Sequence, residues 1–335
     1  MDLKDCLLGD VVTFQRGHDL PKTQMVDGPY PVLGSNGIIG YHNRYTTTGP
    51  VIVVGRSGNV GHPFMVKSNA WAHNTSLYIK DFKGNDPIFI YYFLQTLNLA
   101  KFAGGSAVPT LNRNHINTIE VKIPKDVSVQ QKIGSILASF DEKISTNNKI
   151  NDNLMQQAET LYRYLFIKNA SPKWRTGSMA ELVSVRYGKD HKKLADGTIP
   201  VYGSGGVMRF VERPLYEHES VLIPRKGSLN NIIYVNQPFW SVDTMFYTEM
   251  KLCNVAKYVY FYLKSQNLAA MNVGSAVPSM TTELLNSLQI KIPSNSTLMM
   301  FESIVDPMFK TISHNQIEIK KLMQVRDYLL KKLFS

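Results

Sequence analysis

Two long stretches of the chain repeat apolar side chains at alternating steps of four and three residues. This spacing is typical of the seam of a helix that packs against another helix. The first seam consists of Ile133, Leu137, Phe140, Ile144, Asn147, Asn151, Leu154, Ala158, Leu161 and Leu165, and the second of Phe301, Val305, Met308, Ile312, Asn315, Ile319, Leu322, Arg326, Leu329 and Leu333. The pattern predicts two long helices, with Pro307 as a start or a kink of the second.

The two helices are predicted to pair with each other in antiparallel orientation. A globular segment lies between the end of the first helix and the start of the second, and it can bridge neighbouring ends only if the helices run in opposite directions. Residues whose numbers sum to 466 then face one another, which places Asn151 opposite Asn315 and Leu154 opposite Ile312. A buried Asn pair fixes the register of a helix pair at some cost in stability.

The segment before each helix has short apolar runs bounded by Gly, Pro and Asn, as at residues 51–54 and 220–223. Such runs predict short buried strands with turns between them. Aromatic and Leu residues at helical spacing predict one helix inside each segment, over residues 88–103 and 255–271. We therefore expect each segment to be a mixed α/β domain.

The two halves of the chain repeat the same residues 169 positions apart. The string Gly-Ser-Ala-Val-Pro stands at residues 105–109 and again at 274–278, and Trp71 returns as Trp240. A constant offset indicates one domain plan used twice. The predicted fold class is α+β, with two repeated α/β domains and two long antiparallel helices as a coiled-coil spacer. The predicted boundaries are 1–126 and 171–295 for the domains and 127–170 and 296–335 for the helical spacers.

The charge of the chain points to a polyanionic partner. The formal net charge of the 335 residues is +11, with 17 Lys+Arg against 13 Asp+Glu in residues 1–168 and 20 against 13 in residues 169–335. Because both halves are basic, the charge is not confined to a tail. A basic surface of this kind favours nucleic acid ahead of a membrane.

The composition indicates a cytoplasmic location. No apolar run approaches the length that spans a bilayer, and the first residues lack the features of a signal peptide. Cys6 and Cys253 are isolated cysteines that fit neither a disulfide framework nor a metal cluster.

The sequence lacks the motifs of a catalytic centre. It contains no phosphate-binding Gly-rich loop, no dinucleotide fingerprint, no His-Glu-x-x-His and no nucleophile elbow. His62 and His73 have no Cys or acidic residue at metal-ligand spacing. We therefore expect no catalytic residue, no bound metal and no cofactor.

The domains instead have loops rich in Ser, Asn, Thr, Arg and Gly, whose side chains can read base edges or hold phosphates. The alternative is that such residues simply form turns. The DNA-binding candidates of the first domain are Ser35, Asn36, Arg56, Ser57, Asn59, His73, Asn74, Ser106, Thr110, Asn112 and Arg113. Those of the second are Ser204, Arg225, Lys226, Ser228, Asn230, Asp243, Thr244, Ser275, Ser279, Thr281 and Thr282.

Comparison of the two halves sorts these candidates. Residues that are identical in both halves are predicted to contact phosphates, which are alike everywhere in DNA; Arg56/Arg225 and Ser106/Ser275 are such pairs. Residues that align but differ in hydrogen-bonding pattern are predicted to read bases; Asn74/Asp243, Asn112/Thr281 and Arg113/Thr282 are such pairs. Lys226, aligned with Ser57, adds a charge to the second domain alone.

The organisation resembles the specificity subunit of type I restriction–modification enzymes. The resemblance rests on Gln130-Gln131-Lys132-Ile133-Gly134 and Phe140-Asp141-Glu142-Lys143-Ile144 in the first helix, and on the Gly-Ser-Ala-Val-Pro string followed by Leu111-Asn112. It implies two target-recognition domains that each read one half of a bipartite site in double-stranded DNA, without catalysis. It also implies helices that set the half-site spacing and bind two methyltransferase (modification) subunits, which restriction and translocase subunits join.

Two other functional classes compete with this interpretation. A methyltransferase or nuclease that acts alone needs a catalytic pocket or an acidic metal cluster, and the sequence has neither motif. A two-headed scaffold that binds proteins is the second alternative. The salt dependence of DNA binding separates it from a DNA reader, because phosphate contacts weaken steeply as salt rises.

Overall fold

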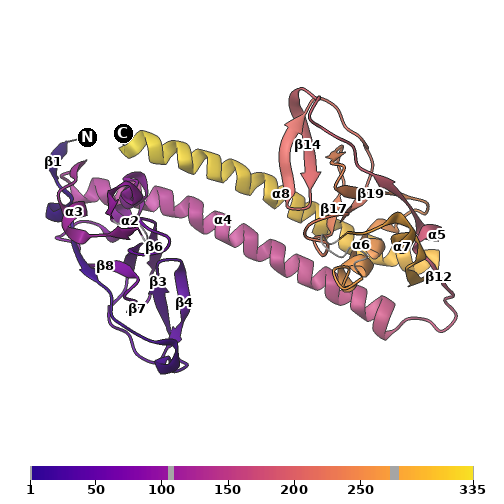
Figure 1. Ribbon diagram of the computed structural model, residues 1–335, viewed down its shortest axis with the longest axis horizontal. Helices are drawn as coiled ribbons and strands as arrows, with labels where there is room; N and C mark the ends of the chain where they lie inside the picture. Colours follow the sequence, from indigo (N-terminus) through magenta and orange to yellow (C-terminus); the bar gives the residue numbers. More distant parts are fainter. Residues whose placement is uncertain (1, 105–108, 272–278, 335) are drawn as a thin grey trace. The chain divides into compact units, whose positions relative to one another are not determined.

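The computed structural model describes residues 2–104, 109–271 and 279–334. It divides into two compact units, Met1–Asn148 with Gln316–Ser335 and Lys149–Asn315. Each unit contains one α/β domain and one half of each long helix (Figure 1). The candidate residues Ser106 and Ser275 of the repeated Gly-Ser-Ala-Val-Pro string lie outside the described residues.

The first domain follows the order strand–helix–strands–helix–strands–helix–strand. Its elements are β1 (Leu3–Leu7), α1 (Leu8–Val11), β2 (Thr13–Arg16), η1 (Lys22–Gln24), β3 (Tyr30–Gly34), β4 (Gly37–His42), β5 (Val51–Gly55), β6 (Pro63–Val66), β7 (Trp71–Ala72), β8 (Ser76–Asp81), α2 (Pro87–Thr96), η2 (Leu99–Phe102), β9 (Ala103–Gly104), β10 (Thr110–Leu111), α3 (Arg113–Asn117) and β11 (Glu120–Pro124). The chain then enters α4 (Val127–Tyr162), which ends in the π-helical turn η3 (Arg163–Lys168).

The second domain repeats this order except for η1, η2, β9 and β10, which have no named counterpart among its described residues. Its elements are β12 (Thr176–Ser178), α5 (Met179–Leu182), β13 (Val183–Tyr187), β14 (Asp196–Gly203), β15 (Gly206–Val211), β16 (Ser220–Pro224), β17 (Ile233–Val235), β18 (Trp240–Ser241), β19 (Met245–Met250), α6 (Ala256–Ser265), α7 (Thr282–Ser287) and β20 (Gln289–Lys291), and the chain ends in α8 (Asn295–Phe334).

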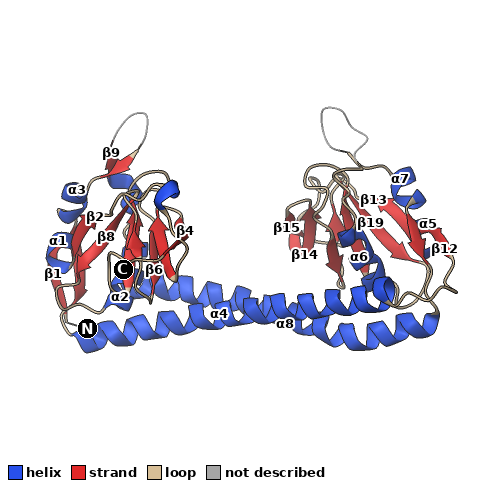
Figure 2. Cartoon of the chain, turned by 90° about the horizontal axis from the view of Figure 1, so that it is seen from below, coloured by secondary structure: helices blue, strands red, loops and turns tan. Residues whose placement is uncertain are grey.

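The larger sheets and the terminal strand pairs of the two domains match strand for strand, whereas the short pair β9-β10 of the first domain has no named counterpart among the described residues of the second. The four-stranded sheets have the orders β2-β8-β5-β6 and β13-β19-β16-β17, and the three-stranded sheets β4-β3-β7 and β15-β14-β18. The terminal pairs β1-β11 and β12-β20 are antiparallel in both. In each domain the strands (red in Figure 2) pack on a short helix, α2 in the first domain and α6 in the second. Buried side chains of α2 and β5 belong to one hydrophobic core, and buried side chains of α6 and β16 belong to another. The predicted α+β class and the repeated domain plan are confirmed.

The short helices end earlier than their periodicity predicts. The predicted ranges were 88–103 and 255–271, whereas α2 ends at Thr96 and α6 at Ser265. Asn98 takes a left-handed conformation with φ of 45°, after which the chain continues as the separate turn η2. A left-handed residue stops an α-helix because its carbonyl and amide groups no longer follow the helix axis.

The seams of the long helices are confirmed, since every seam residue is buried or half-buried. In the second unit the side-chain amide of Asn315 donates to the Asn151 side-chain oxygen over 2.8 Å, which is the predicted register. In the first unit Arg326 forms an ion pair with Asp141 over 2.5 Å. There Asn147 also donates to Glu318 over 2.7 Å. Residue numbers rise along α4 as they fall along α8, so the pairing is antiparallel in each unit.

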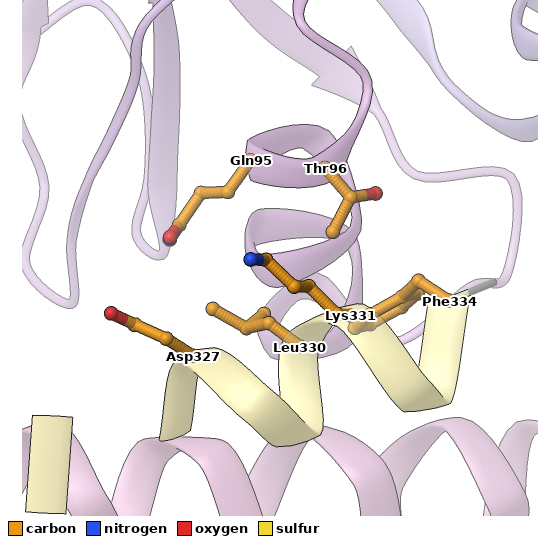
Figure 3. Close-up of a pocket in the computed structure, with 6 residues that line it drawn as sticks. All are labelled: Gln95, Thr96, Asp327, Leu330, Lys331 and Phe334. Carbon is orange, nitrogen blue, oxygen red and sulfur yellow. The ribbon is translucent and has the colours of Figure 1, made fainter. Parts of the chain in front are cut away.

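Pro307 does not begin the second long helix. Helix α8 begins at Asn295, with the Thr297 amide donating to the Ser294 hydroxyl over 3.3 Å, and Pro307 lies inside it. The other end of α8 packs on the first domain. The Phe334 ring lies 5.3 Å from Phe89 and 5.8 Å from Phe93 of α2, beside a shallow hollow that Gln95, Thr96, Asp327, Leu330 and Lys331 also line (Figure 3).

Candidate nucleic-acid interface

Three loops of each domain are joined by the same backbone hydrogen bonds. In the first domain the Arg56 amide donates to the Thr75 carbonyl over 2.9 Å, and the Leu111 amide donates to the Arg56 carbonyl over 2.8 Å. In the second domain the Arg225 amide donates to Thr244 and the Met280 amide to Arg225, each over 2.9 Å. The arginine that follows β5 or β16 is therefore the centre of a fixed loop junction in both domains.

The tip of a β-hairpin lies against this junction. The β3–β4 turn carries Ser35 and Asn36, and the β14–β15 turn carries Ser204 and Gly205. A Cβ atom on Gly58 would lie 3.4 Å from the Ser35 hydroxyl oxygen, and one on Gly227 3.1 Å from that of Ser204. Both glycines have positive φ, 82° and 84°, which L-residues with a side chain rarely adopt. The hairpin tip and the arginine loop thus form one surface.

Two candidate base readers also cap short helices. The Asn112 side-chain oxygen accepts from the Asn114 amide over 3.0 Å at the start of α3, and the Thr281 hydroxyl accepts from the Leu284 amide over 3.2 Å at the start of α7. Asn112 retains its side-chain NH2 as a donor after capping. The caps hold the next residues, Arg113 and Thr282, at the first turn of each helix.

Arg113 and Thr282 differ in the contacts of their side chains. Arg113 is exposed, and no ion pair of its guanidinium is found within the described residues. The Thr282 hydroxyl instead donates to the neighbouring Glu283 carboxylate over 2.9 Å. The first domain therefore presents a cation where the second presents a neutral side chain that is already bonded.

Asn74 and Asp243 occupy matching loops but make different contacts. The Asn74 side-chain NH2 donates to the Asp19 carboxylate, and His73 Nδ1 lies 3.0 Å from the Thr75 hydroxyl oxygen. In the second domain the Asp243 backbone carbonyl accepts from Arg225 over 3.4 Å. Because the Asn74 amide donates to the Asp19 carboxylate, it helps to hold Asp19 in place.

The first domain has a groove that gathers three arginines. The groove lies between the end of β2, with the segment that follows it, and the start of α3. Its lining residues are Gln15, Arg16, Gly17, His18, Asp19, Arg56, Leu77, Thr110, Leu111, Asn112 and Arg113. Arg56, Thr110, Asn112 and Arg113 were predicted from the sequence, whereas Gln15, Arg16, His18 and Asp19 were missed. Arg16 lies 4.0 Å from Asp19, with both side chains more than half exposed.

The arginine of the second domain is stacked on a ring. The Arg225 guanidinium lies 5.4 Å from the centroid of the Tyr187 ring. Lys226 and Ser228 follow on the same loop and are exposed. Asn230 instead contacts the chain after α6, since its side-chain oxygen accepts from the Ala269 amide over 3.0 Å. This contact gives Asn230 a role in supporting the loop.

The remaining candidates divide by position. Asn59, like Asn36, is exposed, and Thr110 and Ser279 are half-buried and form single β-bridges with Ser57 and Lys226. Ser106 and Ser275 lie outside the described residues. No cluster of potential metal ligands is found among residues 2–104, 109–271 and 279–334. None of the helices, over the same residues, is long and apolar enough to cross a membrane.

Comparison with known proteins identifies the repeated domain. The family model described as "Type I restriction modification DNA specificity domain" matches twice, at residues 2–156 and 172–326. The chain is 24% identical to the "Type I restriction enzyme MjaIX specificity subunit" of Methanocaldococcus jannaschii over 73% of this chain and 67% of that protein. It is 23% identical to a protein of Mycoplasma pneumoniae named as a type I specificity subunit, over 98% of this chain and 94% of that one.

A solved structure has the same fold. The type I restriction–modification S subunit from M. genitalium superposes with a TM-score of 0.76 at 20% sequence identity, covering 100% of this chain and 96% of that one. The two family matches cover most of the sequence, and their division agrees with the internal repeat. The chain therefore belongs to the type I restriction modification DNA specificity domain family, and it carries the family's domain twice.

Proposed function

We propose that this chain is the DNA sequence-recognition subunit of a type I restriction–modification complex and has no catalytic activity of its own. One observation carries the proposal. Two copies of one domain share a loop junction centred on Arg56 or Arg225 but present different side chains around it, such as Arg113 against Thr282. A shared frame with different exposed groups suits two domains that hold the same DNA backbone and read different bases.

The domains, at residues 1–126 and 171–295, each read one half of a bipartite site in double-stranded DNA. The helical segments 127–170 and 296–335 set the spacing between the half-sites and bind two methyltransferase (modification) subunits. Restriction and translocase subunits join that core, and the complex acts in the cytoplasm. The partner subunits supply the chemistry, and this chain needs no cofactor for recognition.

The loop candidates divide into backbone contacts and base contacts. Arg56 neutralises a phosphate in the first half-site and Arg225 neutralises one in the second. Lys226 adds a further phosphate contact in the second half-site. Asn74, Asn112 and Arg113 read the first half-site, and Asp243, Thr281 and Thr282 read the second. Ser35, Asn36, Ser204 and Ser228 extend each surface toward the hairpin tip.

The decisive experiment is methylation-motif sequencing with the full chain reconstituted with its modification subunits. We expect one split adenine-methylation motif that disappears when this chain is left out. Arg56→Ala and Arg225→Ala should each weaken binding to all sequences about evenly and reduce the salt slope by about 1, with the motif unchanged. A rewritten motif in either variant would show that these arginines read bases.

A matched pair of controls uses Arg44 and Arg213, which are also 169 residues apart and exposed but lie outside the loop junctions. Arg44→Ala and Arg213→Ala remove the same charge, so binding should change much less than in the junction variants. Equal losses in all four variants would mean that only net charge matters.

A protein-binding scaffold is the second candidate, favoured by apolar residues exposed at matching positions of β4 and β15. Ile39 is 40% exposed and the aligned Met208 61%. Exposed apolar patches often mark protein contacts. A salt titration separates the two functions, because DNA affinity that barely changes with salt would favour the scaffold.

A further inference from the structure

Strand pairing shows that Arg16 of the first domain and Tyr187 of the second occupy corresponding positions, which the sequence repeat at the constant offset of 169 does not show. Arg16 of β2 pairs with Leu77 of β8, and Tyr187 of β13 pairs with Phe246 of β19. Leu77 and Phe246 are 169 residues apart and hold the same place in the two domains. Arg16 and Tyr187 therefore correspond, although they are 171 residues apart.

The residues that follow confirm this correspondence. The Gly17 and Gly188 amides donate to the Ser76 and Met245 carbonyls over 3.0 and 2.9 Å. His18 and Lys189 likewise donate to the carbonyls of Ala72 and Ser241 over 2.7 and 2.8 Å, which again are 169 apart. A Cβ on Gly17 would lie 2.1 Å from the His73 carbonyl oxygen, so the chain passes close to the candidate loop at this point.

The exchange of Arg16 for Tyr187 changes the surroundings of the shared arginine. In the second domain Tyr187 offers a ring face to Arg225, a favourable contact for a guanidinium. In the first domain the corresponding side chain is a second guanidinium, which lines the same groove as Arg56. Like charges close together are costly unless an anion or an acceptor-rich group joins them.

The groove of the first domain has few acidic groups to balance its arginines. Within the lining residues, Asp19 is the carboxylate, and it already accepts from Asn74. Its oxygen lies 4.0 Å from Arg16 with side chains 55% and 74% exposed, a contact that contributes little to stability. Asp19 can nevertheless orient Arg16 without neutralising the groove.

We propose that Arg16 and Arg113 read guanine in the first half-site, and that the second domain, with Tyr187 and Thr282 at these places, does not. This inference rests on the proposed function. The fork of a guanidinium fits the O6 and N7 acceptors of guanine in the major groove. Because the phosphate backbone is common to both half-sites, arginines that only one domain possesses are better suited to read its bases.

The test gives the first domain the residues of the second. Arg16→Tyr and Arg113→Thr are made in the full chain, and each complex with the modification subunits is analysed by methylation-motif sequencing. The wild-type first half-site should contain G·C pairs, and each variant should lose the preference at one of them by about 5- to 150-fold. The second half-site should not change.

Arg44→Tyr makes the same exchange at an exposed arginine outside the groove and should leave the motif intact. The inference is overturned if Arg16→Tyr and Arg113→Thr weaken all sequences evenly with a shallower salt dependence, since that identifies phosphate contacts. It is also overturned if the second half-site changes or if the relaxed position is an A·T pair. Failure of the proposed function is distinguishable, because the wild-type complex would then methylate no split motif at all.

Discussion

Lys257 is the residue whose surroundings are furthest from those of an ordinary surface lysine. Its side chain on α6 is 1% exposed and lies 3.2 Å from Glu219, 2.5 Å from Glu302 and 3.2 Å from Asp306. Burial by itself would lower the pKa of the ammonium group, but Tyr234, Glu219 and Glu302 outweigh burial and hold the pKa above its ordinary value. The charged lysine therefore ties α6 to α8 within the second unit.

Lys257→Met should lower the free energy of unfolding of the second unit by about 3–5 kcal/mol, because it leaves the half-buried carboxylates of Glu219 and Glu302 without their cation, whereas Asp306 keeps Lys310. Hydrogen exchange during urea unfolding measures this, since it separates α6 from the first domain. Lys264→Met on the exposed face of the same helix is the control and should cost less than about 1 kcal/mol. Equal effects of the two substitutions would contradict the structural role of Lys257.

The cost of Lys257→Met should decrease in mild acid. Burial raises the pKa of Glu302 above its ordinary value, so this carboxyl is among the first to gain a proton as pH falls. A protonated carboxyl no longer needs the lysine. In the wild-type chain the raised pKa of Lys257 means that its stabilisation is present below its ordinary pKa of 10.5 and is lost only at higher pH. The free energies of unfolding of the wild type and the variant should therefore differ more at about pH 7 than at about pH 5.

At the scale of elements, local patterns predicted the long helices correctly and placed the ends of the short helices too late. The seam of α4 and α8 extends over many turns, so its periodicity is unambiguous. The end of α2 depends on the left-handed turn at Asn98, which no periodicity reveals. The pairing of β1 with β11 joins residues more than a hundred positions apart, and neither strand has a turn that specifies its partner.

The candidate site was predicted in part for a similar reason. Arg56, Arg113 and their loops follow the constant offset of 169, so the repeat aligns them. Arg16 and Asp19 follow an offset of 171 because the chain between β2 and β3 differs in length from that between β13 and β14. The signal that could have found them is short: Gly17-His18-Asp19 returns as Gly188-Lys189-Asp190.

The register of the helix pair makes a prediction for the second unit. Asn151 and Asn315 fix the register, so Leu154 and Ile312 are the next facing positions on the seam. Leu154→Cys with Ile312→Cys should form an intramolecular disulfide on oxidation, detected as a faster-migrating monomer under non-reducing conditions. Asp152→Cys with His314→Cys is the control, since both positions are exposed and should not crosslink within the chain. Crosslinking between two chains at equivalent positions would indicate a parallel dimer instead.

At the scale of the whole molecule, the repeat makes each domain a separable recognition unit. Each unit has its own core, and the terminal strand pairs β1-β11 and β12-β20 close both domains in the same way. Because these closing pairs lead directly into α4 and α8, one domain can replace the other without a change in the helix seam. Recognition of the two half-sites should then be independent.

A domain exchange tests this independence. Replacing residues 177–293 by the corresponding residues 6–124 gives a chain with two copies of the first domain. On the proposed assignment of base contacts to the loops and of backbone contacts to residues shared by both domains, the complex should methylate a motif made of two copies of the first half-site. The gap between the half-sites should keep its length, because the helices are unchanged. Methylation-motif sequencing measures both properties, with the wild-type complex as reference. A motif that retains the second half-site would place its readers outside the exchanged domain, and a changed gap would show that the domains help to set the spacing.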